Sequence, residues 1–509
     1  MKKHLSLVLA LLMLIAVMAA SCARSGNSGE TTAPVNDTVD GTETGNPGTS
    51  PADTDAETEK EPDNLTMAQR HAKVADGLPD KKMDGMEFRL YISDNDRRKQ
   101  MTGANGETGD IVDAAAIRRN RKIEDRFDVK IKPIVAYDGF NTGFEVATST
   151  GEDLFDLAMG AYTDFPAMAQ TGYCLDWGSG LPYVDLDKPW YNQSARDTLS
   201  VDGHTYVMVG DLELDVLQCA YCIFWNQQFA KDVGLQESIF DVVESGRWTY
   251  DYLLALSNQY YSDNGDSIKD ENDRLVFAGD PNSAVVTWQY AFDNPIYKTV
   301  NGVPEFSMDL EKQHGMVNKL NALYWDSPGG YTKDWFAGLS AWKRGDLLAQ
   351  TGMFMYYDMY RDIRFDFTII PYPKYDEEQT NYYSMSDGAS SMMAVPTTIK
   401  GNEENVSILI EAINAESYKI VTPTYFETVM QHKYMDSDER SIEMMELIWG
   451  GVVYDFGFAY NSLLGNISFQ ISKFIKKNSN DTQSTYDALA ISNRSKSFDI
   501  IEAYRLLNR

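Results

Sequence analysis

Apolar and polar positions in the first part of the folded chain alternate between strand patterns and helix patterns. Strand patterns cover 86–92, 129–135 and 154–159. A helix pattern covers 110–127, and a second one ends before Gly151. The apolar residues that can line one face of the first helix are Ile111, Ala114, Ala115, Ile123 and Phe127. Strands that alternate with helices predict a parallel sheet with helices on both faces.

The same alternation returns in the second half of the chain. Strands are predicted at 217–225 and 365–370. Helices are predicted at 250–260, 311–325 and 405–417. The globular part begins at about residue 84 and is longer than one hydrophobic core normally serves, so we expect two lobes. Ligands of open α/β sheets bind beyond the carboxyl ends of the strands, and two facing lobes would hold such a site between them.

The N-terminus has the pattern of an export signal. Lys2 and Lys3 precede an apolar run over 5–20, and small residues then lead to Cys22. The run is shorter than the roughly 20 residues that span a bilayer, so 1–21 is interpreted as a signal peptide. The end of the signal resembles the lipobox of bacterial lipoproteins, in which the cysteine receives a diacylglycerol, although Ala19 stands where Leu is usual. We expect lipidation of Cys22, with plain secretion as the alternative.

The segment after the signal is acidic and rich in Gly, Thr and Pro. No Lys or Arg occurs between Ser25 and Glu59. Such a composition cannot bury enough apolar surface to offset the entropy lost on ordering, so 22–83 is predicted to be disordered. It is either a tether that holds the globular part away from the membrane or a leader with no spacing role.

Charge and cysteine content exclude two classes of protein. A formal net charge of -31 and a pI near 4.5 argue against nucleic acid as a partner and favour a neutral or cationic ligand. Beyond Cys22 the chain has only Cys174, Cys219 and Cys222, which is too few for a disulfide scaffold. Cys219 and Cys222 have redox spacing, but in a strand they point to opposite faces, so we expect buried structural thiols.

Short motifs along the globular part occur in an order that is typical of one protein family. They include Arg119-Asn120, Leu154-Phe155-Asp156-Leu157, Leu186-Asp187-Lys188-Pro189-Trp190, Phe224-Trp225-Asn226, Gly246-Arg247-Trp248-Thr249, the stretches 367–375 and 416–425, and Tyr454-Asp455. Together they resemble the extracellular solute-binding proteins of family 1, the substrate-binding lipoproteins of ABC-type sugar importers. The resemblance covers nearly the whole globular part, although no single motif is a catalytic signature.

The resemblance implies an α/β fold of the periplasmic-binding-protein-like type II class, a two-lobed Venus flytrap. Two crossing segments are expected near 224–226 and 367–375. The lobes are then predicted as 84–218 plus 374–425 for the first and 219–373 plus 426–509 for the second. The crossing segments of such a fold act as a hinge that shuts around the ligand.

The resemblance also implies a function. We expect an extracellular receptor that captures a carbohydrate or oligosaccharide between its lobes without chemical change and delivers it to an ABC-type permease. Such a receptor would be a monomer without cofactor, metal or catalytic residues, anchored by its lipid to the outer face of the cytoplasmic membrane at the cell surface.

Aromatic and polar residues near predicted strand ends are candidates for sugar binding, because a saccharide offers flat C–H faces and a rim of hydroxyls. Tyr162, Thr163 and Asp164 follow a predicted strand, although Asp164 may instead cap the next helix. A predicted apolar strand over 353–358 delivers Tyr356, Tyr357 and Asp358, which align with the place where the family presents a stacking aromatic. Packing in the core is the alternative for these tyrosines.

Three further residues are candidates by position. Trp225 lies at the first predicted crossing, Trp288 lies in a loop-rich region, and Asp387 lies in a turn after the second crossing. Burial in the core is the alternative for Trp225, and stabilisation of the turn is the alternative for Asp387.

Two other functions stay open. A secreted glycan-degrading enzyme would need only two carboxylates at a fixed separation, although the chain has neither a G-x-S-x-G nor an H-E-x-x-H motif. A surface glycan-binding lipoprotein that is not coupled to transport would have the same sequence features.

The stretch 262–273 approximates a calcium-binding loop, with oxygen donors at its first, third, fifth, ninth and twelfth positions. Ser262 replaces the first carboxylate, and Ser267 stands where the sharp turn favours Gly. A solvated acidic loop is therefore predicted, with a structural calcium site as the alternative.

Overall fold

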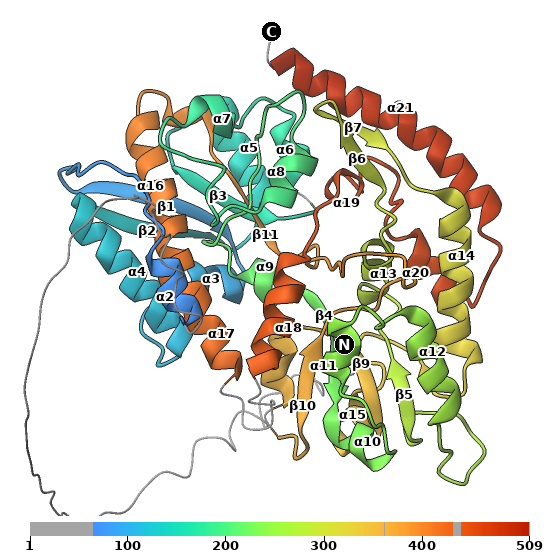
Figure 1. Ribbon diagram of the computed structural model, residues 1–509. Coiled ribbons are helices and arrows are strands. Elements are labelled where there is room, and N and C mark those ends of the chain that lie inside the picture. The colour runs from blue at the N-terminus through green and yellow to red at the C-terminus, as the bar shows by residue number, and fades with distance from the viewer. Residues whose placement is uncertain (1–64, 164, 361, 431–438, 508–509) are drawn as a thin grey trace, which may run out of the picture. The chain divides into compact units, whose positions relative to one another are not determined.

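The computed structural model of the protein describes residues 65–163, 165–360, 362–430 and 439–507 (Figure 1). The predicted signal peptide, Cys22 and most of the predicted tether lie outside these ranges, as does Asp164. Within the described ranges, no helix combines the length and the apolar character that crossing a bilayer requires.

A first sheet of four strands, here called sheet 1, contains most of the strands of the N-terminal half. Its order is β11-β3-β1-β2, formed by Ser391–Ala394, Leu157–Ala161, Met86–Ser93 and Val129–Ala136. β1 is parallel to both β2 and β3, whereas β11 is antiparallel to β3. Along β1 every second side chain is buried, Phe88, Leu90 and Ile92 among them, which confirms the strand pattern of the sequence.

The helix α4 (Ile111–Phe127) connects β1 to β2, and the side chain of Asp110 caps its first turn. Its buried face differs from the predicted one. Ile111 and Ala114 are exposed, and Val112 and Ala116 take their places in the core. The cap fixes where the helix begins, so the buried stripe is rotated relative to the one that apolar spacing alone suggested.

A second sheet of five strands, sheet 2, is formed later in the chain. Its order is β10-β4-β9-β5-β8, formed by Phe367–Ile370, Tyr221–Asn226, Leu347–Met353, Leu275–Ala278 and Gly330–Tyr331. β5 is parallel to β8 and β9, but β4 is antiparallel to β9 and β10. Both sheets are therefore mixed, which corrects the prediction of parallel sheets. β4 and β11 each enter their sheet directly from the other one, without a crossover helix, so they run against their neighbours.

Helices and a small hairpin surround the sheets. Near sheet 1 lie α3 (Asp96–Thr102), α5 (Phe140–Thr150), α6 (Phe165–Ala169), α7 (Trp177–Gly180), α8 (Gln193–Leu199), α16 (Glu403–Glu416) and α17 (Thr422–Met430). Near sheet 2 lie α10 (Gln227–Asp232), α11 (Ile239–Glu244), α12 (Tyr250–Gln259), α13 (Thr287–Ala291), α14 (Leu310–Asn321), α15 (Leu339–Arg344), α18 (Glu439–Gly450) and α20 (Gln470–Lys476). The hairpin β6 (Tyr297–Val300) and β7 (Val303–Phe306), α19 (Phe456–Ala459) and the long α21 (Gln483–Leu507) complete the chain.

Two predicted strands are partly helical. The residues before β4 form the short helix α9 (Asp215–Gln218), and β9 ends at Met353, after which η3 (Phe354–Tyr360) is a 3-10 helix. In both places a short run of mostly apolar residues is interrupted by polar ones, and such a run does not distinguish a strand from a helix.

The last part of the predicted disordered segment is folded. Helix α2 (Met67–Ala72) begins with a capping box at Thr66. The ring of His71 stacks on Tyr418 with 3.6 Å between centroids, and Met67 packs against the core. The prediction of disorder over 22–83 is therefore wrong for residues 65–83, where a few apolar side chains find partners far away in the sequence.

The three cysteines of the globular part are buried and unpaired, as predicted. Burial raises the pKa of the Cys174 thiol to about 12, and burial also raises the pKa values of Cys219 and Cys222. These thiols are inert at neutral pH, so redox chemistry at the Cys219–Cys222 pair is excluded.

Three segments pass side by side between the sheets. The crossings predicted near 224–226 and 367–375 are wrong, because these residues include parts of the strands β4 and β10 inside sheet 2. The Tyr221 amide donates to Met385 O and the Asp387 amide to Cys219 O, which joins the first crossing (217–221) to the second (384–390). The Val453 amide donates to Ser384 O, which joins the third crossing (451–455) to the second. The second crossing is thus hydrogen-bonded to another crossing segment on each side.

A buried carboxyl gives the folded state a measurable pH dependence. Asp211 is buried and accepts a hydrogen bond of 2.7 Å from Thr422 Oγ1, and burial raises its pKa to about 7. In the unfolded chain the same carboxyl has a pKa of about 4. Between these two values only the folded state holds the proton, so the free energy of unfolding falls as the pH rises.

We expect Asp211→Asn to remove this contribution, because an amide keeps the acceptor oxygen without a charge. Urea unfolding of the wild type and of the variant at pH 5 and pH 7.5 measures it. The wild type should lose on the order of 2 kcal/mol more than the variant between these pH values. Equal losses in the two proteins would show that Asp211 is ionised in the folded state throughout this range.

Candidate functional site

The carboxyl ends of strands from both sheets meet the crossing segments. Ser391 of β11 pairs with Ala161 of β3, so the second crossing reaches sheet 1 at the carboxyl end of β3. Tyr221 of β4 pairs with Met353 of β9, so the first crossing reaches sheet 2 at the carboxyl end of β9. Ligands of α/β folds bind at such edges. We call this region the junction.

The junction is held by side-chain contacts between the sheets. Arg97, on the helix after β1, places its Nη1 3.6 Å from the Sδ of Met355, on η3 after β9. Gln218 Nε2 donates to Gln100 Oε1 at 3.1 Å, and Tyr221 OH donates to Asp387 Oδ2 at 2.7 Å. Residues of α3, α9, η3 and the second crossing are thus neighbours at one place.

Arg97 is the charged residue of the junction with the most unused hydrogen-bonding capacity. It is half-buried, its Nε is buried without a hydrogen-bond partner, and it makes no ion pair within the described part of the chain. A guanidinium offers several donors in a rigid plane, which suits hydroxyl or carboxylate oxygens of a ligand. Arg97 was not predicted from the sequence; the available signal was its place a few residues beyond the predicted strand 86–92.

Tyr356 and Asp387, both predicted from the sequence, lie at the junction and are half-buried. Burial raises the pKa of Tyr356 to about 12, and the nearby carboxylates of Asp280 and Asp387 add to this shift. The phenol is therefore neutral and can both donate and accept a hydrogen bond. Asp387 Oδ1 accepts from the Ala389 amide at 2.9 Å, so this carboxylate also stabilises its own turn, as the alternative interpretation proposed.

Of the three site residues predicted after β3, one lies at the junction and one lies in the core. Thr163 is half-buried, and its Oγ1 donates to Gly388 O of the second crossing at 3.3 Å. Tyr162 is 2% exposed, and its hydroxyl bonds both the amide and the carbonyl of Asp455. Thr163 therefore stays a candidate, whereas Tyr162 joins β3 to the third crossing inside the core. Asp164 lies outside the described residues.

Three other predicted aromatic residues are buried. Trp225 lies at the far end of β4, opposite Thr368, with its ring edge-on to Trp248. Trp288 is fully buried, and its Nε1 donates to Tyr324 OH at 3.0 Å. Tyr357 packs edge-on to Tyr425. We therefore exclude Trp225 and Trp288 from the junction, and assign Tyr357 to packing. The side chain of Asp358 is not among those described.

Exposed aromatic side chains lie at the carboxyl-end edges of both sheets, and they were not predicted from the sequence. Trp335 and Phe336, in the loop after β8, are 54% and 50% exposed. Their loop begins beside the end of β5, where Thr332 Oγ1 donates to Gly279 O at 2.9 Å. Tyr137, directly after β2, is 73% exposed. Large aromatics in water at ligand-facing strand ends are typical of binding surfaces. Two adjacent aromatics within a polar loop were the signal in the sequence.

Comparisons with known proteins support the fold. No family model and no curated protein matches the chain. The cyclic alpha-maltosyl-1,6-maltose binding protein of Arthrobacter globiformis has 13% identity and a TM-score of 0.54, over 82% of this chain and 99% of its own. The chain therefore has the two-lobed, periplasmic-binding-protein-like α/β fold of that protein, and the predicted fold class is confirmed.

Two other solved structures match at lower TM-scores. An ABC substrate-binding protein of Listeria monocytogenes, in complex with cycloalternan, has 12% identity and a TM-score of 0.48, over 83% of this chain and 99% of its own. The GacH receptor of Streptomyces glaucescens, studied unliganded and with acarbose, has 13% identity and a TM-score of 0.48, over 83% of this chain and 98% of its own.

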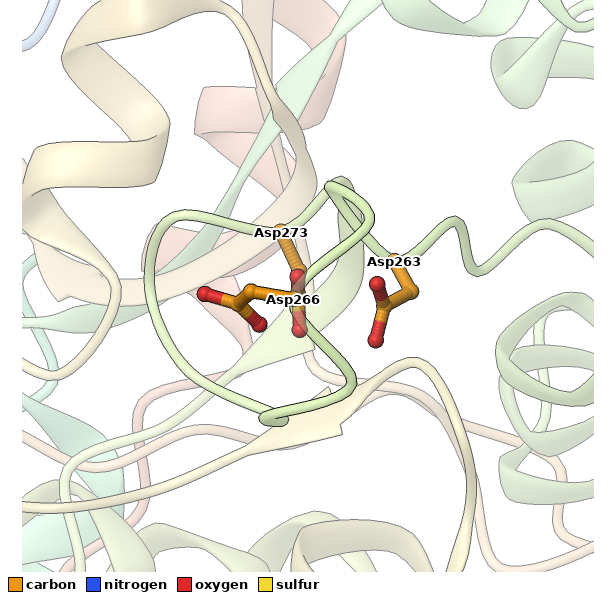
Figure 2. Close-up of side chains that lie close together, drawn as sticks. All are labelled: Asp263, Asp266 and Asp273. Carbon is orange, nitrogen blue, oxygen red and sulfur yellow. The ribbon is translucent and has the colours of Figure 1, made fainter.

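The acidic loop lies between α12 and β5, apart from the junction. Carboxylate oxygens of Asp263, Asp266 and Asp273 lie within 4.8 Å of one another (Figure 2). Asp273 is fully buried, and it accepts hydrogen bonds from Tyr261 OH and from the amides of Asn264 and Asp270. Asp263 and Asp266 accept bonds from amides within the loop. The loop is also held from outside, because Lys269 Nζ donates to Trp325 O and Ser327 O.

We expect Asp273→Ala to destabilise the protein by about 1–3 kcal/mol, because it removes a buried carboxylate that accepts three hydrogen bonds from part-buried donors. Urea unfolding in the presence of a chelator measures this loss without any contribution from bound cations. Asp263→Ala is the matched control, since its exposed carboxylate bonds only exposed amides and its removal should cost well under 1 kcal/mol. A loss for Asp273→Ala no larger than that of the control would contradict this role.

Proposed function

We propose that the protein is the substrate-binding receptor of an ABC-type importer and that it holds a carbohydrate at the junction without changing it chemically. One observation carries the proposal: ligand-facing edges of two sheets meet at the crossing segments, and both edges expose aromatic and polar side chains there. The confirmed fold supports it, because the solved protein that shares this fold is named for the oligosaccharide that it binds.

The chemistry of the junction suits a sugar. Trp335, Phe336 and Tyr137 offer aromatic faces against which the C–H faces of a pyranose ring can pack. Arg97, Thr163 and Tyr356 offer neutral and cationic hydrogen-bonding groups for the hydroxyl rim, and Asp387 offers a carboxylate. A mostly apolar surface with a few polar groups in fixed places is the usual composition of small-molecule sites.

The crossing segments provide the hinge. Among the described residues, three segments pass between the sheets at this place, and they are bonded to one another through the second crossing. A ligand that contacts both edges stabilises the arrangement in which those edges are close, and it shifts the equilibrium by its difference in affinity for the two arrangements.

The carboxyl groups favour binding over hydrolysis. A glycosidase needs a carboxylic acid that stays protonated near neutral pH beside the scissile bond. Among the described residues, the carboxyls whose pKa is raised are Asp211, Glu213, Glu411 and Asp455, and all of them are buried. At the junction, Asp280 accepts hydrogen bonds at both oxygens from the backbone of 282–284, so it caps a helical turn.

The location and partners follow from the sequence. We propose that lipid on Cys22 anchors the receptor to the outer face of the cytoplasmic membrane and that residues before about 65 link the anchor to the folded part. The partner that takes the sugar is a membrane permease, and the receptor works as a monomer. A net charge of -31 disfavours nucleic acid as a ligand.

Thermal unfolding of the purified protein against mono- and oligosaccharides, beginning with linear and cyclic α-glucans, tests the proposed ligand class. A ligand that binds only the folded state raises the melting temperature by mass action. We expect at least one oligosaccharide to do so and to be recovered intact. Shifts with peptides or polyamines alone would overturn the ligand class, and recovery of a shortened sugar would indicate an enzyme.

We expect Trp335→Ala to weaken binding of that oligosaccharide by about tenfold or more, since one stacked aromatic ring is lost. Titration calorimetry measures the dissociation constant. Phe498→Ala is the matched control, because Phe498 is a similarly exposed aromatic, 58% exposed, on α21. Equal affinity of Trp335→Ala and the wild type would place the sugar elsewhere.

A further inference from the structure

A second cavity lies apart from the junction. It has a volume of about 400 Å³, and its walls come from α8, from the segment 290–299 between α13 and β6, and from the crossing residues Tyr383, Val453 and Tyr454. None of the junction residues named above lines it. Its volume is at the lower end of the range for small-molecule sites, about 300–1,000 Å³.

Two tyrosine hydroxyls in this cavity are buried. Tyr290 and Tyr454 are each 3% exposed. Ser468 Oγ, which donates to Gly457 O, also offers a side-chain hydrogen bond to the Tyr290 phenol, whereas the Tyr454 phenol has no hydrogen-bond partner among the described residues. A buried hydroxyl without a partner costs about 1–3 kcal/mol, so a ligand that bonds Tyr454 would remove this cost.

The rest of the wall combines aromatic rings with hydroxyls. The Tyr297 hydroxyl is occupied by Asn493 and that of Tyr383 by Asn381, so these two residues supply ring surface. Ser194, Thr198 and Thr299 add hydroxyl oxygens. Thr198 Oγ1 donates to Ser194 O, Thr299 Oγ1 donates to Asp197 O, and Ser194 Oγ accepts from the Tyr454 amide, so these oxygens keep lone pairs with which to accept from a ligand. An aromatic wall with several separate hydroxyls matches a ligand that has apolar ring faces and hydroxyls around them.

The charge around the cavity is nearly balanced. Asp197 is paired with Arg196 at 3.0 Å, and the remaining charged residues of the wall, Asp293 and Lys298, are exposed and of opposite sign. Neither an anion nor a cation would gain from a buried countercharge here, so a neutral ligand is favoured.

We propose that this cavity is a second carbohydrate site, which takes a neutral mono- or disaccharide whose hydroxyls bond Tyr290 and Tyr454. The inference is independent of transport and of what binds at the junction. Helix α8 and the hairpin strand β6 are already in contact at the cavity, where Thr299 Oγ1 donates to Asp197 O at 2.6 Å, so a sugar here would add further contacts between these two elements.

Crystals of the protein soaked in glucose or in maltose, and titration calorimetry with the same sugars, test the site. We expect one sugar to lie in the cavity within hydrogen-bonding distance of both phenols, and we expect the double variant Tyr290→Phe, Tyr454→Phe to weaken its binding at least tenfold. Trp335→Ala should leave this binding unchanged, which separates the cavity from the junction.

The double variant should fold, because it keeps both rings and removes only the hydrogen bond between Tyr290 and Ser468; its melting temperature should stay close to that of the wild type. Water alone in the cavity of soaked crystals, or equal affinity of the double variant and the wild type for both sugars, would overturn the proposal. Binding of choline or of glucuronate in the cavity in place of both neutral sugars would also overturn it.

Discussion

The guanidinium of Arg98 fixes the place where the two sheets meet. It donates to Ser93 Oγ at the end of β1, to Ser391 Oγ at the start of β11, and to the carbonyls of Ala389 and Ser390. Ser391 in turn donates from its amide and its hydroxyl to the carboxylate of Asp215. Arg98 is 3% exposed and Asp215 is fully buried, so both charges are satisfied inside the protein. The network sets the position of the second crossing against sheet 1.

The candidate site follows from this network. Every guanidinium nitrogen of Arg98 donates a hydrogen bond. Its neighbour Arg97 points its guanidinium toward Met355, and its Nε has no hydrogen-bond partner among the described residues. The same crossing places Asp387 beside Tyr221 and Gly388 beside Thr163. The buried network of Arg98 and Asp215 thus lies within a few residues of the candidate side chains. The network has its hydrogen bonds satisfied, whereas the candidate side chains that it holds in place use only some of theirs. This combination is what a binding site requires, because its polar groups must be rigid and still have capacity for a ligand.

The sequence predicted the strands and helices of sheet 1 well, since their apolar residues recur at regular spacing. Prediction from the sequence was less accurate for the segments that leave the sheets. The residues after Met353 are apolar in an unbroken run, and such a run fits a buried strand as well as the 3-10 helix that forms. Helix α2 was missed because its partners, Tyr418 and Glu446, lie more than 340 residues away along the chain.

Burial separates the predicted site residues that stay candidates from those that pack in the core. Trp225, Trp288 and Tyr356 are all aromatic residues near apolar segments, and nothing local in the sequence distinguishes them. Tertiary packing places the first two in the core of sheet 2 and leaves Tyr356 half-exposed at the junction. Trp335 and Phe336 were missed for the opposite reason: they lie in a polar loop, and only the position of β8 at the edge of sheet 2 brings them to the ligand-facing side.

A crystal structure of the protein with its tightest-binding oligosaccharide is the most direct measurement of the central claim, that two sheets share one ligand. We expect an intact sugar that contacts the loop after β8 on one side and the second crossing on the other, with Arg97 bonded to its rim. A sugar that contacts only one of the two sheets, or one found cleaved, would contradict this claim.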